Sequence, residues 1–167
     1  MITTEQIKSL RDKTGISVMQ CKKALEEAAG DQEKALAILR EKSKEMADKK
    51  SDRALGAGHI DAYVHSTGTI GAMVELVSET DFVSKNEDFK KIAHDIAVHI
   101  VASNVLYLRA SDVPEDKKTE AVDTILLDQP FFKNPETTIQ GLIDGAIQKF
   151  GEKIEIARYA KFSVLEK

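Results

Sequence analysis

The chain contains 167 residues, 42% of them hydrophobic and 31% charged, which suffices for one domain with a real core or one domain plus a small module. The formal net charge of −4 is uneven: residues 1–53 carry 12 basic and 10 acidic side chains, and the remainder carries 12 and 18. Because nucleic-acid affinity comes mainly from neutralising phosphates, the acidic larger part argues against direct DNA or RNA binding.

Residues 1–40 predict a module of three short helices. Thr3 or Thr4 can cap the first helix, which Gly15 ends, and Ser17 starts the second, SVMQCKKALEEAAG, which closes at Gly30. Asp31 then caps DQEKALAILREK. Three helices of this length bury little surface, so we expect the module to be marginally stable by itself.

Within the second helix, Cys21 falls at helical spacing with Val18, Leu25 and Ala28. This position favours a small buried packing residue over a reactive thiol. Residues 41–57 follow as a charged linker that is helical at its start. Its basic residues fit either a solvated spacer or a contact with an acidic partner surface.

From Gly58 the apolar period changes to two, which predicts a β-hairpin with one buried face. We expect the buried face to carry Ile60, Ala62 and Val64 of the first strand and Ile70, Ala72, Val74 and Leu76 of the second. His59, Asp61 and His65 share the opposite face, but their spacing along the strand gives no compact ligand set. No metal site and no cofactor are therefore expected.

Helices and a last strand complete the pattern. Ser84 and Glu87 suggest a capping box for the helix NEDFKKIAHDIAVHIVASNVL, and SDVPEDKKTEAVDTILL suggests a second helix entered through Pro114. The segment DQPFFKNPETT is expected to be a loop, followed by the helix TIQGLIDGAIQKF and the strand KIEIARYAKFSVL. Residues 58–167 thus predict an α+β core, in which a small antiparallel sheet of about three strands packs with helices.

Sequence signals for catalysis, secretion or membrane insertion are missing. No phosphate-binding loop, dinucleotide fingerprint or nucleophile elbow occurs. Asp81, as a lone carboxylate in a turn, lacks a second titrating group to share general acid/base work. One cysteine gives no disulfide framework, no apolar run is long enough to span a membrane, and the N-terminus lacks a signal peptide's apolar segment. We expect a cytoplasmic protein that is not an enzyme.

The junction between the second strand and the next helix carries Thr80, Asp81, Phe82 and Val83 where turns normally carry Gly, Asn, Ser or Pro. These four residues are called the TDFV turn below. Phe82 either folds back onto its own core or projects as an anchor into a pocket of another protein. Spacing alone does not separate these two interpretations.

Four ordered blocks, which cover most of the chain, resemble the bacterial elongation factor Ts family, the guanine-nucleotide exchange factors of the GTPase elongation factor Tu. They are LRDKTGISVMQCKKALEEAAGDQEKALAILRE, ELVSETDFVSKNEDF, AVHIVASNVLYL, and LLDQPFFKNPETTIQGLI with IQKFGEKIEIARYAKF. The first block is similar to the family's ubiquitin-associated-like module.

The resemblance implies roles for particular residues. It makes the TDFV turn the intruding tip, with Asp81 and Phe82 entering near the Mg²⁺ and phosphate site of elongation factor Tu. It implies that the N-terminal module docks on the GTPase domain. The weaker contacts that it implies are Leu10, Cys21, Lys22, Lys23 and His99.

The chain departs from longer family members in ways that affect these expectations. It passes from YLRASDVPEDKKTEAVDTI almost directly to LLDQPFFKNP, so it resembles a short form that has lost a central helical hairpin. Short forms pair up, which implies a homodimer. Ala160 stands where some short relatives have a linking cysteine, so the dimer is expected to be non-covalent. The alternative function is a protein-binding module of the same fold that docks without exchange activity.

Overall fold

The N-terminal forty residues fold as the three helices that the sequence predicts. The computed structural model describes residues 2–166, and in it Thr3, Ser17 and Asp31 each accept a backbone N–H as helix N-caps. Gly15 ends the first helix at φ +68°, a left-handed conformation that glycine adopts without steric cost. The helices are α1 (Thr4–Thr14), α2 (Val18–Glu27) and α3 (Gln32–Lys50).

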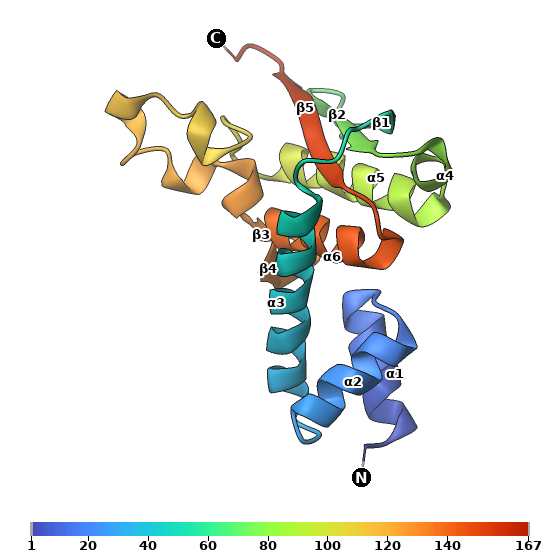
Figure 1. Cartoon of the computed structure of the whole chain (residues 1–167). Helices are drawn as coiled ribbons and strands as arrows, with labels where there is room; N and C mark the ends of the chain where they lie inside the picture. Colours follow the sequence, from blue (N-terminus) through green and yellow to red (C-terminus); the bar gives the residue numbers. More distant parts are fainter. Residues whose placement is uncertain (1, 167) are drawn as a thin grey trace.

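Helix α3 is longer than expected because its second half packs on the rest of the molecule. Residues 41–50, assigned to a charged linker from the sequence, continue the helix, and Met46 and Ala47 pack against the main core. Buried Ser43 donates a hydrogen bond to Gln148 of α6, which lies 105 residues further along the chain. Figure 1 shows α3 as a long rod between α1 and α2 at one end and the sheet at the other.

The three strands form one antiparallel sheet in the order β1–β2–β5, so the terminal strand joins the hairpin as predicted. The strands are β1 (Ala57–Val64), β2 (Ile70–Ser78) and β5 (Ile154–Ser163). A register shift between Glu75 and Leu76 marks an irregularity in the pairing of β2 with β5.

The prediction of which face of β1 is buried was wrong. In the register of the hairpin, His59, Asp61 and Tyr63 lie opposite the buried residues Leu76, Val74 and Ala72, and directly opposed residues share a face. The half-buried polar side chains of β1 therefore face α5, where Asp61 contacts His94 at 3.0 Å and His59 at 3.3 Å. The apolar residues Ile60, Ala62 and Val64 are exposed.

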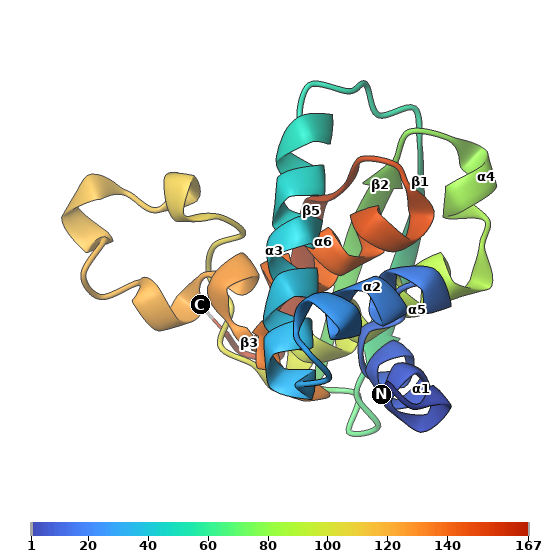
Figure 2. The same ribbon diagram turned by 60° about the horizontal axis from the view of Figure 1, so that its bottom comes forward.

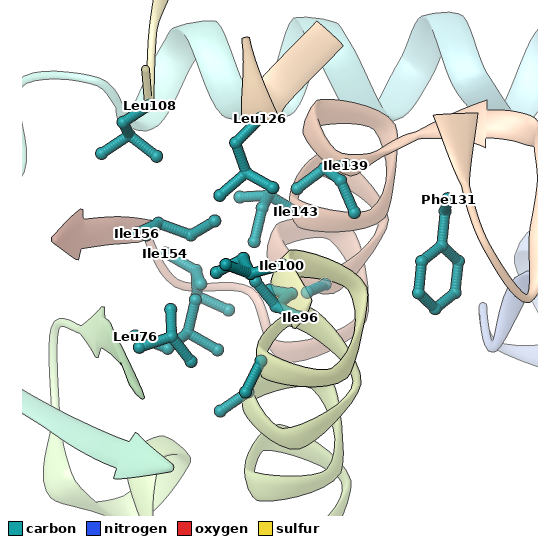
Figure 3. Packing of buried hydrophobic residues seen from close by; sticks show 14 of the residues in the cluster. Leu76, Ile96, Ile100, Leu108, Leu126, Phe131, Ile139, Ile143, Ile154 and Ile156 are labelled. Carbon is teal, nitrogen blue, oxygen red and sulfur yellow. The ribbon is translucent and has the colours of Figure 1, made fainter. Parts of the chain in front are cut away.

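Helices α5 (Glu87–Ala102) and α6 (Ile139–Phe150) supply much of the main core. In Figure 3, Ile96 and Ile100 of α5 and Ile143 of α6 converge on Leu76, Ile154 and Ile156 of the sheet. The N-cap of α5 is Asn86, whose side chain accepts a hydrogen bond from the Asp88 N–H at 2.8 Å. The predicted capping box fails because Ser84 belongs to a separate short helix, α4 (Asp81–Ser84).

Residues 103–138 differ most from the prediction. The expected helix over SDVPEDKKTEAVDTILL is a chain of 3₁₀ turns, held by local bonds such as Lys117 N–H to Pro114 O and by a small cluster of Val113, Ala121 and Ile125. Figures 1 and 2 show this segment projecting from the body. Its elements are η1 (Ala110–Asp112), η2 (Glu115–Lys117), η3 (Val122–Thr124) and η4 (Leu126–Asp128).

The loop expected over DQPFFKNPETT contains a short antiparallel pair, β3 (Pro130–Phe131) and β4 (Asn134–Thr138). Buried Phe131 at the end of β3 ties this pair to the main core. Within residues 2–166, no helix combines the length and apolar character that crossing a bilayer would need. The same residues contain no group of three or more His, Cys, Asp or Glu arranged to hold a metal ion.

Candidate functional site

The TDFV turn follows Glu79, the residue after β2, and supplies the N-cap and the first three residues of the single-turn helix α4. The Ser84 N–H donates to Thr80 O, and the Lys85 N–H donates to Asp81 O at 3.0 Å, so the chain completes α4 before α5 begins. Val83 is 4% exposed and belongs to the main core, whereas Phe82 is 86% exposed. Of the two interpretations left open by the sequence, the structure therefore supports the one in which Phe82 projects from the molecule.

The N-terminal side of the turn is held by residues from the other end of the chain. Glu152 accepts hydrogen bonds from the Thr80 N–H at 3.0 Å and from the Thr80 hydroxyl at 2.5 Å. Beside it, Glu79 accepts from the Lys153 N–H at 2.6 Å and lies 3.4 Å from the Arg53 guanidinium. The bond from Lys153 is the main reason that the pKa of Glu79 is lowered. These contacts could not be read from the sequence.

Asp81 is charged and open to solvent beside the exposed ring. Its carboxylate contacts Lys85 Nζ at 2.7 Å, one helical turn further on, and both side chains are largely exposed. The hydrogen bond and the charge of Lys85 lower the pKa of Asp81, and the same pair raises the pKa of Lys85. Asp81 therefore adds negative charge next to Phe82 at neutral pH.

In the N-terminal module, the structure separates the proposed contact residues into two groups. Leu10 and Cys21 are buried in the module's own core, and burial raises the pKa of the Cys21 thiol. Lys22 and Lys23 are exposed. The module's surface also carries Val18 and Met19, 52% and 68% exposed. The sequence analysis placed Val18 on the packing stripe of Cys21, which the structure corrects, and did not select Met19. Adjacent apolar residues directly after the N-cap were the available signal, because α2 buries only one side.

The resemblance implied that His99 is a partner contact at the surface. The structure corrects this, because His99 is 2% exposed and lies inside the main core. Gln129 donates both amide protons to the carbonyls of Asn104 and Asp123, so its Oε1 accepts from His99 Nε2 at 2.9 Å. His99 Nδ1 accepts from the Phe132 N–H at 3.3 Å. His99 therefore joins α5 to residues 129–132. Burial lowers the pKa of His99.

The outward side of the sheet is a further surface that the sequence analysis missed. The reason is that the sequence analysis placed the apolar residues of β1 on the buried face. Its members share exposure and apolar character, and they come from all three strands. We call this the outer sheet face, made of Ile60, Ala62, Val64, Met73, Ala160 and Phe162. Phe162 is 78% exposed and Val64 66%. Exposed apolar patches of this kind mark interaction sites more often than isolated exposed residues do.

A ring on a braced turn, exposed apolar side chains on α2 and an apolar sheet face together define a protein that presents contact surfaces to other proteins. The comparisons with known proteins agree with that class. A family model described as Elongation factor TS matches residues 3–122. The chain belongs to the elongation factor Ts family.

Relatives named Elongation factor Ts match almost the whole chain. The protein from Acetivibrio thermocellus is 40% identical over 192 residues, which cover 97% of this chain and 89% of the relative. Those from Carboxydothermus hydrogenoformans and Thermodesulfovibrio yellowstonii are also 40% identical, covering 99% and 98% of this chain and 90% and 96% of the relatives. The aligned spans exceed the 167 residues present here, so the relatives contain residues with no counterpart in this chain.

Proposed function

We propose that this chain, an exchange factor for elongation factor Tu by family, releases GDP by inserting Asp81 and Phe82 beside the Mg²⁺ and phosphate site of that GTPase. The observation that carries the proposal is the contrast in exposure between two adjacent residues, Phe82 and Val83. Val83 anchors the turn in the core, while Phe82 is 86% exposed on a turn braced by Glu79 and Glu152. A fixed, exposed aromatic side chain suits insertion into a pocket on a partner.

The energetics of one inserted ring set the scale of the effect. The factor and GDP each weaken the other's binding by the same factor, because coupling between sites is reciprocal. Burying one Phe contributes about 1.5–3 kcal/mol, and about 1.4 kcal/mol changes affinity tenfold. Phe82 alone thus accounts for about ten- to a hundredfold weaker GDP binding. The linkage also means that arriving GTP displaces the factor.

Docking of the N-terminal module supplies the remaining affinity in this scheme. Val18 and Met19 offer apolar area, and Lys22 and Lys23 flank it with positive charge. Leu10 and Cys21 act indirectly, by holding α2 in place from the module's core. Exchange of this type makes and breaks no covalent bond on the factor, so in this proposal the chain is a binding protein, not an enzyme, and needs no cofactor of its own. The proposal also places the chain in the cytoplasm and assigns it no nucleic-acid contact.

Stopped-flow release of fluorescent GDP from elongation factor Tu tests the insertion. The parent protein is expected to accelerate release strongly, and Phe82→Ala is expected to lower the maximal rate by about ten- to a hundredfold. Phe132→Ala is the matched control, because Phe132 is also an exposed ring (40%) but lies on the β3–β4 turn. Circular dichroism melts establish that both variants fold.

The same experiment separates exchange from the alternative of docking alone. A parent protein that binds elongation factor Tu without accelerating release would leave only the docking module. Acceleration that survives Phe82→Ala would keep the exchange function and refute insertion of the ring.

We also propose that two copies of this chain form a non-covalent homodimer through the outer sheet face. The supporting features are the exposed side chains of Val64, Met73 and Phe162 on adjacent strands. Ala160 lies within this patch and offers no thiol for a covalent link. Sedimentation velocity is expected to give a dimer for the parent and a monomer for Phe162→Asp. Leu106→Asp, at an exposed apolar residue outside the patch, is expected to remain dimeric. A monomeric parent at working concentration would refute the dimer.

A further inference from the structure

Two pairs of neighbouring residues, Glu79–Thr80 and Glu152–Lys153, bind each other reciprocally at the base of the TDFV turn. In one direction, the backbone and hydroxyl of Thr80 donate to the two carboxylate oxygens of Glu152. In the other, the backbone of Lys153 donates to Glu79. The two pairs are more than 70 residues apart in the chain, so this contact joins the end of β2 to the corner between α6 and β5.

Thr80 is held at each of its polar atoms. As the N-cap of α4 it makes no capping bond with its own side chain, because its hydroxyl is turned toward Glu152. Its carbonyl accepts from Ser78 Oγ at 2.9 Å and from the Ser84 N–H at 3.3 Å. With Val83 buried three residues later, Phe82 lies on a short segment fixed at both ends.

Glu152 is itself placed by the helix that precedes it. Gly151 ends α6 at φ +74°, and its N–H donates to Ile147 O at 2.8 Å, so the chain turns sharply and presents Glu152 to Thr80. Helix α6 is in turn joined to α3 through the buried bond between Ser43 and Gln148. Packed elements thus connect the N-terminal module to the base of the turn.

We propose that Glu152 is a positioning residue for nucleotide exchange, which orders the TDFV turn before the partner arrives. The inference rests on the proposed insertion of Phe82 and assigns a residue to it that the motif does not contain. A turn already held in the inserted conformation loses less conformational freedom when it binds, and that saving appears as tighter binding of the distorted, GDP-releasing state. Glu152 reaches the partner only through Thr80 and Phe82.

The order of the turn can be measured without elongation factor Tu. The chain contains no tryptophan, so Phe82→Trp places a single reporter at the tip. Time-resolved anisotropy is expected to show slow, whole-molecule tumbling in this variant and an added fast local motion when Glu152→Ala is introduced. Equal anisotropy decays with and without the Glu152 side chain would overturn the positioning role.

A double-mutant cycle then tests whether the effect passes through Phe82. Glu152→Ala is expected to lower the maximal rate of GDP release about tenfold, equivalent to about 1.4 kcal/mol, with a half-saturating concentration near that of the parent. In the Phe82→Ala background the same substitution is expected to cause no further loss. Glu152→Gln, which keeps one carbonyl acceptor for Thr80, is expected to fall between the parent and Glu152→Ala.

The controls keep this inference separable from the insertion itself. Glu120→Gln removes the charge of an exposed carboxylate in the 3₁₀ segment and is expected to leave exchange unchanged. A loss for Glu152→Ala that persists in full without Phe82 would overturn the inference, since it would show a general structural effect. If Phe82→Ala itself left exchange intact, the insertion would fail, while the anisotropy decay would still decide whether Glu152 orders the turn.

Discussion

The N-terminal module and the TDFV turn both expose apolar side chains, but they support them in different ways. Met19 lies on α2 of a module whose described core consists of eight small to medium side chains. Phe82 lies on a turn anchored in a cluster of twenty buried residues and braced by the Glu152 side chain and the Lys153 backbone of the α6–β5 corner. In the proposed function, the module therefore contributes contact area, whereas the turn contributes a fixed position.

Helix α3 is the element that the two regions share. Its first half supplies Ala35 and Leu39 to the module's core, and its second half brings Met46 and Ala47 to the main core. Because the smaller core has few contacts of its own, its helices depend on α3 for their placement. This arrangement predicts that the module opens at a lower free energy than the sheet and α5 do.

The largest expected effect is selective unfolding of the module. Leu25 is fully buried in the module's core, and Leu25→Ala is expected to cost about 2–5 kcal/mol. Native-state hydrogen exchange should then show lost protection in α1 and α2 while β2 and α5 stay protected. Ile96→Ala, in the main core, is the matched comparison and should lower protection throughout. Equal loss in both regions for Leu25→Ala would show that they unfold as one unit.

A substitution with a smaller expected effect tests whether the module supplies contact area while the TDFV turn supplies a fixed position. Met19→Asp removes exposed apolar area and places a negative charge beside Lys22 and Lys23, so it is expected to raise the half-saturating concentration for GDP release about tenfold or more. The maximal rate should change little. Phe82→Ala should instead lower the maximal rate and leave the half-saturating concentration nearly unchanged. A Met19→Asp variant that lowers the maximal rate at saturation would contradict the division of roles between the two regions.

Sequence reasoning succeeded where a local pattern determines structure. The N-caps at Ser17 and Asp31 and the C-terminal glycine Gly15 predicted helix ends that the structure confirms. The oddity of Phe82 at a strand–helix junction was also visible locally, and its exposure agrees with one of the two interpretations.

The errors came from features that depend on distant residues. Alternation along β1 shows that the strand has two faces, but only α5, through His94 and its contact with Asp61, shows which face is inward. Residues 41–50 are charged enough to resemble a linker that is helical only at its start, and packing against α6 explains why the helix continues to Lys50. The brace on Thr80 comes from Glu152, 72 residues later, so no local pattern could predict it.

The main core contains a buried polar group, His99, whose charge state should control stability near neutral pH. Burial lowers the pKa of His99 from its ordinary value of 6.5, and a second ring proton would face the N–H of Phe132. Below pH 6.5 the unfolded chain therefore binds a proton that the folded chain does not, so stability is greatest above this pH and falls as the pH decreases toward the lowered pKa.

Urea unfolding between pH 7.5 and 5.5 tests the role of His99. The decline is expected to reach at most about 1.4 kcal/mol per pH unit. His99→Gln should be less stable at pH 7.5 but should show a shallower decline, because the other three histidines are common to both proteins. Identical slopes for the parent and His99→Gln would contradict a neutral buried His99.

The smallest expected effect concerns the charge beside Phe82, the ring that we propose is inserted. Lys85 pairs with Asp81 at 2.7 Å, but both side chains are at least 70% exposed, so Lys85→Ala should leave the unfolding free energy almost unchanged. In the proposed insertion, removal of Lys85 leaves the negative charge of Asp81 unopposed near the Mg²⁺ and phosphate site, so the maximal rate of GDP release should rise roughly twofold at low salt. Added salt should remove this gain, because screening weakens interactions between exposed charges. A maximal rate that decreases in Lys85→Ala and stays low at high salt would instead show that Lys85 contacts the partner directly. The position of Phe82 on the partner would then depend on residues at both ends of α4, Thr80 and Lys85.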